Sequence, residues 1–164
     1  MIKNSCPTFI VAGGVRCASG WIRECLSEHP DIYIHPKEIH FFDQNYEKGL
    51  KWYLDFFKDQ KDKRILGEKT ATYLHTEKIA TLINHLFPNI KLIFCLRDPV
   101  DRMISHYIMS SSMDNTHREI GFLESIENDP KFLEWGKCII FPLGLKEKRC
   151  LRMKNLMKKI LKNG

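Results

Sequence analysis

Residues 7–22 of the chain read Pro-Thr-Phe-Ile-Val-Ala-Gly-Gly-Val-Arg-Cys-Ala-Ser-Gly-Trp-Ile. The β-branched and apolar run at 8–12 predicts a strand that is buried on both faces. Gly13 and Gly14 then allow a turn through backbone angles that other residues avoid. A helix is expected to follow the small residues, with an apolar stripe at helical spacing that faces inward. The stripe consists of Trp21, Ile22, Cys25 and Leu26.

The turn between this strand and this helix is a candidate anion site. Backbone N–H groups and a helix N-terminus converge there, and both favour negative charge. Arg16 adds a planar guanidinium suited to phosphate or sulfate. The spacing matches neither G-x-x-x-x-G-K-[ST] nor G-x-G-x-x-G, because the glycines stand at 13, 14 and 20 and Trp21 follows the last one. A glycine-rich turn without any ligand is the alternative that these residues leave open.

Length and charge predict one main domain and a basic segment. The 164 residues carry a net charge of +6. Residues 146–164 hold eight basic and one acidic side chain, whereas residues 1–145 hold eighteen basic and nineteen acidic ones. We therefore expect one main domain over 1–145, followed by a basic helix or tail over 146–164, and no nucleic-acid partner.

Cysteine spacing and hydropathy narrow the class of protein further. The six cysteines form no C-x-x-C pair and no zinc spacing, so no metal site is expected. No run approaches the roughly 18 apolar residues of a membrane span, and no secretory signal is visible. A cytoplasmic location is the expectation that follows.

Strands alternate with helices along the chain, which predicts an α/β fold. Further strands are expected at Asp31–His35, Arg64–Thr70 and Ile90–Leu96, the last strongly buried, with an edge strand at 138–143. Helices are expected at Glu47–Lys58, from a Thr76 cap to Leu86, from an Asp98 cap to about Ser110, at 119–135 and at 146–162, with a polar loop at 111–117. This order predicts a three-layer sandwich around a short parallel sheet.

Arg97 directly follows the expected strand at 90–96, just as the Gly13–Gly20 loop follows the first strand. Ligands of open α/β sheets bind at the carboxyl ends of the strands. Two anion-seeking clusters at one sheet edge predict a ligand with two separated anionic groups.

Three segments, in this order, resemble the sulfotransferase family that uses 3′-phosphoadenosine-5′-phosphosulfate. Gly14-Val-Arg-Cys-Ala-Ser-Gly-Trp21 is similar to its 5′-phosphosulfate loop, and Lys37-Glu-Ile-His-Phe-Phe-Asp43 to a segment of its carbohydrate-type members. Leu96-Arg-Asp-Pro-Val-Asp-Arg-Met-Ile-Ser-His-Tyr107 is similar to its 3′-phosphate segment, and Gly67-Glu-Lys-Thr70 is a weaker match between them. The matches lie within residues 8–107. The resemblance implies a P-loop-like sulfotransferase fold, in a nucleotide-binding domain over 1–145.

The resemblance also implies residue roles. Glu38 would be the catalytic base, and Arg16 would hold the 5′-phosphate oxygens as charge develops on the leaving group. Arg97 and Ser105 would bind the 3′-phosphate. The donor loop would consist of Gly14, Val15, Arg16, Cys17, Ala18, Ser19, Gly20 and Trp21, with Trp21 either near the adenine or packed in the core. The implied reaction moves a sulfuryl group to an acceptor hydroxyl, with a carbohydrate as candidate acceptor and no metal.

Several alternatives stay open at this point. Glu38 is alternatively a structural ion-pair partner, and His40 is interpreted as a packed or supporting residue rather than the base. Gly20 stands where the family usually has a hydroxyl residue, and Ala18 replaces a glycine. Family members usually continue well past the third segment, and no counterpart is found here after about Trp135. The second functional hypothesis is therefore a truncated, inactive nucleotide-binding or interaction module of the same fold. A small-molecule kinase of the P-loop type is disfavoured, because the lysine-hydroxyl pair that it needs is missing.

Overall fold

The structure is a computed structural model that describes residues 6–60 and 62–113. It divides after Leu96 into two units, which are treated separately below. The first unit contains β1 (Phe9–Gly13), α1 (Ser19–Ser27), β2 (Ile32–Ile34), α2 (Phe41–Gln44), the 3-10 turn η1 (Tyr46–Lys48), α3 (Gly49–Asp55), β3 (Ile65–Lys69), the 3-10 turn η2 (Ala71–His75), α4 (Glu77–Leu86) and β4 (Lys91–Phe94). The second contributes α5 (Pro99–Met113).

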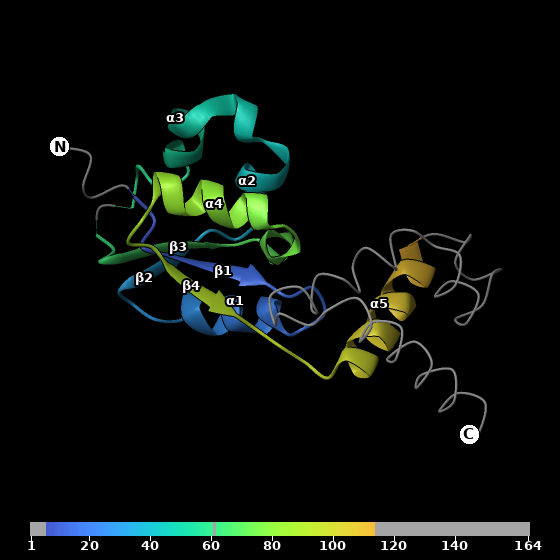
Figure 1. The fold of residues 1–164 in the computed structure, drawn as a ribbon. Helices are drawn as coiled ribbons and strands as arrows, with labels where there is room; N and C mark the ends of the chain where they lie inside the picture. Colours follow the sequence, from blue (N-terminus) through green and yellow to red (C-terminus); the bar gives the residue numbers. More distant parts are fainter. Residues whose placement is uncertain (1–5, 61, 114–164) are drawn as a thin grey trace, which may run out of the picture. The chain divides into compact units, whose positions relative to one another are not determined.

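A parallel sheet forms the centre of the first unit. Its strand order is β2-β3-β1-β4, and every pair is parallel. Two consecutive parallel strands need a connection that crosses over one face of the sheet. In sheets of this kind, helices in the connections cover both faces. Figure 1 shows α1 on one side of the sheet and α2, α3 and α4 on the other. The three-layer α/β prediction is therefore confirmed.

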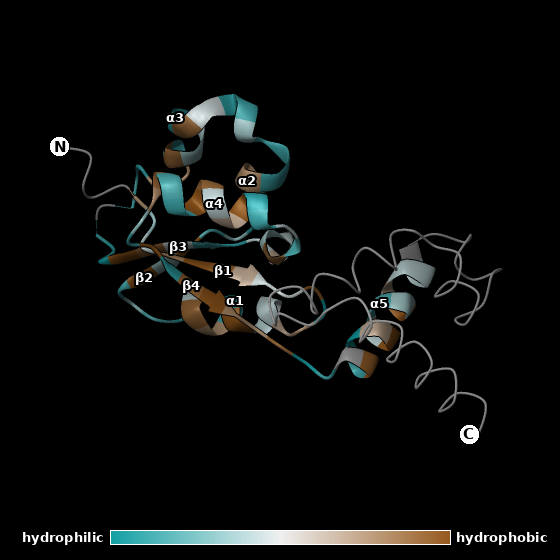
Figure 2. Cartoon of the chain, in the orientation of Figure 1, coloured by the Kyte–Doolittle hydropathy of each residue, from teal (hydrophilic) through white to brown (hydrophobic). Residues whose placement is uncertain are grey.

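The side chains of β1 point alternately to the two faces of the sheet and belong to a separate apolar cluster on each face. Ile10 and Ala12 pack under α2, α3 and α4, in a cluster that includes Ile79 and Ile83 of α4. Phe9 and Val11 point to the opposite face, where the partly buried Ile22 and Leu26 of α1 cover them. Both faces of β1 are buried, and its sequence is accordingly apolar throughout. This uninterrupted apolar run is what predicted the strand. Figure 2 shows the same feature as brown colour along β1, whereas α4 alternates teal and brown.

Aromatic side chains fill the core above the sheet. The Phe41 ring stacks on the Tyr53 ring, with centroids 4.6 Å apart and planes 15° apart. Phe42 meets the same tyrosine edge-on at 5.6 Å. Aromatic pairs in these arrangements add roughly 0.5–1.5 kcal/mol to the effect of burial. The Phe41-Phe42 pair therefore anchors α2 to α3, and both side chains are buried in the core.

Helix boundaries differ from the prediction in two places. The helix expected at Glu47–Lys58 is a 3-10 turn followed by α3, because Gly49 takes φ 81° and ψ 159° between them. After Asp55 the chain continues in turns, such as the bond from Phe57 N to Leu54 O at 3.0 Å. The other difference is the end of α5, which runs to Met113 rather than to Ser110. Residues 111–113 are therefore helical, and the loop predicted for them is wrong.

Two predictions of burial are also wrong. In the described part of the sheet β4 pairs only with β1, and Phe94 is 47% exposed on this edge strand. On α1, Trp21 and Cys25 face solvent, and only Ile22 and Leu26 pack inward. Hydrophobic content alone does not distinguish an edge strand from a central one, nor a covered helix flank from an open one.

Some predictions lie outside the described residues. They are the helix at 119–135, the strand at 138–143 and the basic helix at 146–162. The division into 1–145 and 146–164 likewise stays a prediction. Among the residues that the structure describes, none of the helices has the length and apolarity that crossing a membrane requires.

Candidate functional site

Gly13 ends β1 and starts the turn that the sequence singled out. Its φ of 138° suits glycine, and a Cβ atom there would lie 2.6 Å from the carbonyl oxygen of Ala71. The turn is tied to the chain after β4 by two hydrogen bonds. Gly14 N donates to Cys95 O at 2.8 Å, and Cys95 N donates to Gly13 O at 2.6 Å. The loop therefore starts from a fixed point at the carboxyl edge of the sheet.

The residues after this point wind tightly into α1. Arg16 and Ala18 both take φ 63°, and both are exposed, whereas Cys17 and Ser19 are buried. Because α1 begins at Ser19, its first N–H groups lack partners within the helix and lie at the end of this loop. Left-handed residues alternating with others bend a loop into a concave array of amides that suits anions. The predicted donor loop from Gly14 to Trp21 thus has the expected strand-turn-helix form.

Trp21 lies in the first turn of α1 and is 66% exposed. Packing in the core is therefore excluded for this ring. The alternative, a place near a bound base, stays a prediction.

Glu38 lies at the centre of a charged cluster at the same sheet edge. One carboxylate oxygen, Oε1, accepts a hydrogen bond from Lys69 Nζ, at the end of β3. The other, Oε2, lies 3.2 Å from Nε2 of His40. Glu38 is partly exposed, so its carboxylate is held by two neighbours and still open to a ligand.

His40 connects Glu38 to a second carboxylate. Its Nδ1 lies 3.1 Å from Oδ2 of Asp43, and that same oxygen accepts a hydrogen bond from Thr72 Oγ1. The two contacts of the ring are hydrogen bonds at the same time only when both ring nitrogens carry hydrogen. His40 itself has φ 54°, and this left-handed backbone turns its side chain back over the cluster at the start of α2. The interpretation of His40 as a supporting residue agrees with this geometry.

Sequence reasoning missed Lys69 and Thr72 as members of the cluster. They lie far from Glu38 along the chain, and the parallel pairing of β2 with β3 brings the segments together. The sequence did contain a signal for Lys69. Adjacent strand residues point to opposite faces, so Leu66 and Glu68 share one face and Lys69 lies on the other. In register, Glu68 pairs with Ile10 and Lys69 with Val11. Lys69 therefore points to the face opposite Glu68, where it is largely buried and reaches Glu38 at the end of β3.

Glu68 precedes Lys69 on β3 and points to the opposite face of the sheet. It is fully buried, and burial raises the pKa of its carboxyl from 4.5 to about 7, with the charge of Asp43 adding to the increase. Hydrogen bonds from Tyr53, Thr70 and Tyr73 act in the opposite direction. Burial also raises the pKa of the Tyr53 and Tyr73 hydroxyls, which therefore stay protonated and act as donors.

Arg97 and Ser105 belong to the second unit. Arg97 is exposed, and Ser105 is partly buried on α5. The predicted cap is confirmed, because Asp98 Oδ1 accepts hydrogen bonds from Val100 N at 2.9 Å and Asp101 N at 3.1 Å. Binding of a 3′-phosphate by Arg97 and Ser105 stays a prediction.

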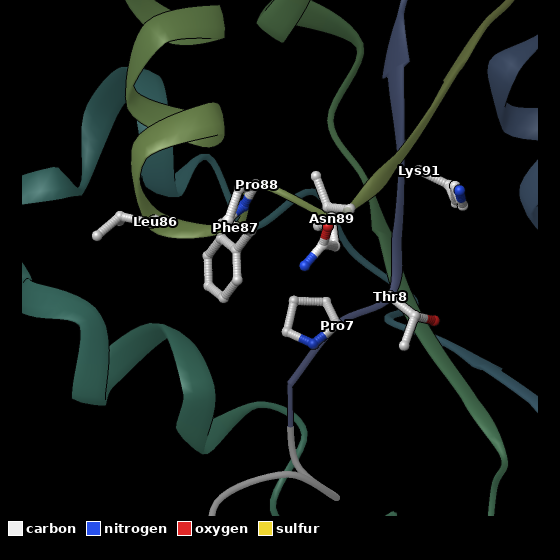
Figure 3. Close-up of a pocket in the computed structure, with 8 residues that line it drawn as sticks. Pro7, Thr8, Leu86, Phe87, Pro88, Asn89 and Lys91 are labelled. Carbon is white, nitrogen blue, oxygen red and sulfur yellow. The ribbon is translucent and has the colours of Figure 1, made fainter.

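A hollow of about 380 Å³ lies elsewhere on the first unit. Figure 3 shows Pro7, Phe87 and Pro88 around it, with Thr8 and Lys91 at its side. Thr8 precedes β1 and Lys91 begins β4, so this hollow lies at the amino ends of the strands. It is therefore separate from the carboxyl edge that carries the loop and the Glu38 cluster. Among residues 6–60 and 62–113, no group of three or more His, Cys, Asp or Glu side chains is placed to hold a metal ion.

Comparisons with known proteins all point to one family. The family model described as "Sulfotransferase domain" matches residues 7–155. Human heparan sulfate glucosamine 3-O-sulfotransferase 3B1 is 38% identical over 106 residues, which are 65% of this chain and 27% of that protein. The membrane-associated sulfotransferase kil1 of Dictyostelium discoideum is 34% identical over 108 residues, which are 63% of this chain and 23% of that protein. The chain thus matches about a quarter of the length of these relatives.

A solved structure agrees with the sequence comparisons. The crystal structure of a sulfotransferase from Alicyclobacillus acidocaldarius matches with a TM-score of 0.69 and 25% identity. The match covers 82% of this chain and 64% of that one.

Proposed function

The chain belongs to the sulfotransferase domain family, and on that premise we propose that it transfers a sulfuryl group from 3′-phosphoadenosine-5′-phosphosulfate to a hydroxyl of a carbohydrate acceptor. The names of the heparan sulfate relatives support the acceptor class. A cytoplasmic location remains a separate prediction.

The observation that carries the proposal is the position of Glu38. Its carboxylate lies between Lys69 and His40, at the sheet edge where the glycine turn also emerges. Lys69 and His40 hold the carboxylate in one orientation. A partly exposed carboxylate held in this way is suited to accept a proton. General bases of this kind contribute a factor of about 10² to 10⁴.

The proposed reaction is an in-line displacement at sulfur. The acceptor oxygen forms a new bond to sulfur as its proton passes to Glu38, and the bond from sulfur to the 5′-phosphate oxygen breaks. The leaving nucleotide keeps that bonding pair, so negative charge develops on its 5′-phosphate. Arg16 and the amides from Ala18 to Gly20 supply donors for this charge, which is the main requirement of such transfers. The Cys17 amide, which the resemblance also included, donates to Gly14 O at 3.2 Å.

The second candidate is an inactive nucleotide-binding module. Two features of the loop favour it. Ala18, in the place of a family glycine, holds φ 63°, and Gly20 supplies no hydroxyl to the loop. A non-glycine residue in this region costs roughly 1–2 kcal/mol. This candidate binds nucleotide without turnover.

Two measurements on the purified full chain separate the candidates. Isothermal titration with 3′-phosphoadenosine-5′-phosphate measures nucleotide binding, and transfer of labelled sulfate from the donor to heparan-type oligosaccharides measures turnover. Binding with transfer supports the enzyme, and binding without transfer supports the module. Absence of binding contradicts both.

Two variants test the residue roles. Glu38→Gln is expected to leave nucleotide affinity unchanged and to lower turnover by about 10² or more. Arg97→Ala is expected to weaken nucleotide binding, and equal affinity in this variant and the parent would remove its role. Glu47→Gln is the matched control, because it neutralises an exposed glutamate on η1, outside the site.

A further inference from the structure

The proposed reaction does not use Glu68, although this carboxyl is fully buried beside the site. Its Oε1 accepts hydrogen bonds from the Tyr53 hydroxyl at 2.7 Å and the Tyr73 hydroxyl at 3.2 Å. Its Oε2 accepts one from Thr70 Oγ1 at 2.9 Å. Each hydroxyl has a single hydrogen to donate, and the two oxygens of the Glu68 carboxyl accept all three.

Two of these hydroxyl oxygens also accept hydrogen bonds from the backbone. The Tyr73 oxygen accepts from Phe41 N at 2.8 Å and from Phe42 N at 3.4 Å. Thr70 Oγ1 accepts from His40 N at 3.4 Å. Because Glu68 fixes where each hydroxyl hydrogen points, the oxygen lone pairs are directed at these N–H groups.

These three N–H groups are the ones that a helix start leaves without partners. His40 precedes α2, and its side chain makes no capping bond to the helix. Its left-handed backbone needs support from the surroundings, because such a conformation costs roughly 1–2 kcal/mol outside glycine. Glu68 acts through the hydroxyls of Thr70, directly after β3, and of Tyr73 on η2, and supplies the support that a side-chain cap would normally give.

We propose that Glu68 is a positioning residue, which fixes the backbone N–H groups of residues 40–42 through Tyr73 and Thr70 and thereby holds the His40 ring between Glu38 and Asp43. The inference rests on the proposed function only in that the Glu38 cluster performs the transfer. The positioning itself is a property of the protein without any ligand.

Tyr53 and Tyr73 form a matched pair for the test. Both hydroxyls donate to Oε1 of Glu68, and both side chains are buried. Only the Tyr73 oxygen also contacts the backbone of Phe41. Tyr53→Phe and Tyr73→Phe therefore each remove one donor from the same carboxylate, but only the second removes the connection to α2.

We expect nuclear magnetic resonance of the full chain to separate the two variants without any activity. In Tyr73→Phe the amide resonance of Phe41 and the ring resonances of His40 shift, whereas in Tyr53→Phe they stay near their parent positions. Equal changes in the two variants, or no change in Tyr73→Phe, would overturn the inference. This result stands whether or not the protein transfers sulfate.

Transfer kinetics supply the second readout. Tyr73→Phe is expected to lower kcat at least tenfold with an unchanged nucleotide affinity, and Tyr53→Phe to lower it less than threefold. A parent without turnover contradicts the proposed function and leaves the resonance test intact. If Tyr73→Phe does not fold, Thr70→Val and Thr70→Ser replace it. The serine retains the hydroxyl and is expected to restore the parent His40 resonances, and a serine that behaves like valine would refute the link.

Discussion

Replacing Glu68 by glutamine should change how the stability of the protein depends on pH. Burial raises the pKa of this carboxyl to about 7 in the folded protein, against an ordinary value of 4.5 that the unfolded chain restores. Between these values the folded protein retains the proton and the unfolded chain releases it. Rising pH therefore favours unfolding across this window, and the stability that Glu68 contributes is complete below pH 4.5 and lost above about 7.

The size of the effect follows from the two pKa values. One pKa unit corresponds to about 1.4 kcal/mol, so the difference between about 7 and 4.5 amounts to about 3 kcal/mol. Asp43 on α2 is the other acidic group that raises this pKa, whereas Tyr53 on α3 and Tyr73 on η2 lower it by donating hydrogen bonds. Glutamine has no titration, so Glu68→Gln should lack this loss of stability.

The assay is urea unfolding of the full chain at several pH values from 4.5 to 8. The unfolding free energy of Glu68→Gln minus that of the parent should rise by about 3 kcal/mol between pH 4.5 and 7.5 and then stay level. Ile83→Val is the control, because it alters the same core by about 0.5–1.5 kcal/mol and adds no titrating group. If the unfolding free energy of Glu68→Gln relative to the parent is as independent of pH as that of Ile83→Val, the reasoning is refuted.

Three other changes test the fold. Gly13→Ala should destabilise the first unit by about 3 kcal/mol or more, because φ 138° and the Ala71 oxygen 2.6 Å away both oppose a Cβ atom; an unchanged melting temperature would contradict this. Phe41→Ala should lower the unfolding free energy by about 3–5 kcal/mol, and Phe41→Leu by clearly less, as urea titrations can measure. Asp98→Ala should cost α5 about 1 kcal/mol and Asp98→Asn little, which amide exchange at Val100 would detect; equal exchange in the two variants would exclude a cap.

The sequence contained enough information for the layers of the fold, because the apolar run after Pro7 ends at the Gly13-Gly14 turn and the expected strands alternate with expected helices. It also identified Thr76 as the residue before α4 and Asp98 as the cap of α5. Exposure was harder to predict. The apolar composition of β4 is compatible with a central or an edge strand, and only the pairing order decides between them.

The candidate site was predictable only where its residues are close in the sequence. Glu38 and His40 stand in one dense segment, and the family resemblance singled out Glu38. Lys69 and Thr72 join them through the register of β3 beside β2, which no local pattern specifies. The role of Glu68 was hidden for the same reason, since a charged residue within a strand ordinarily predicts exposure.

The alternation at the end of β3 makes the charged contacts of the protein depend on the register of one strand. Glu68 points into the aromatic core and Lys69, its neighbour, points to the opposite face and reaches Glu38, so a slip of this strand by one position would exchange their environments. A misregistered molecule would therefore lose the contact between Lys69 and Glu38 and place an ammonium group beside the hydroxyls of Tyr53 and Tyr73, which now surround a carboxyl.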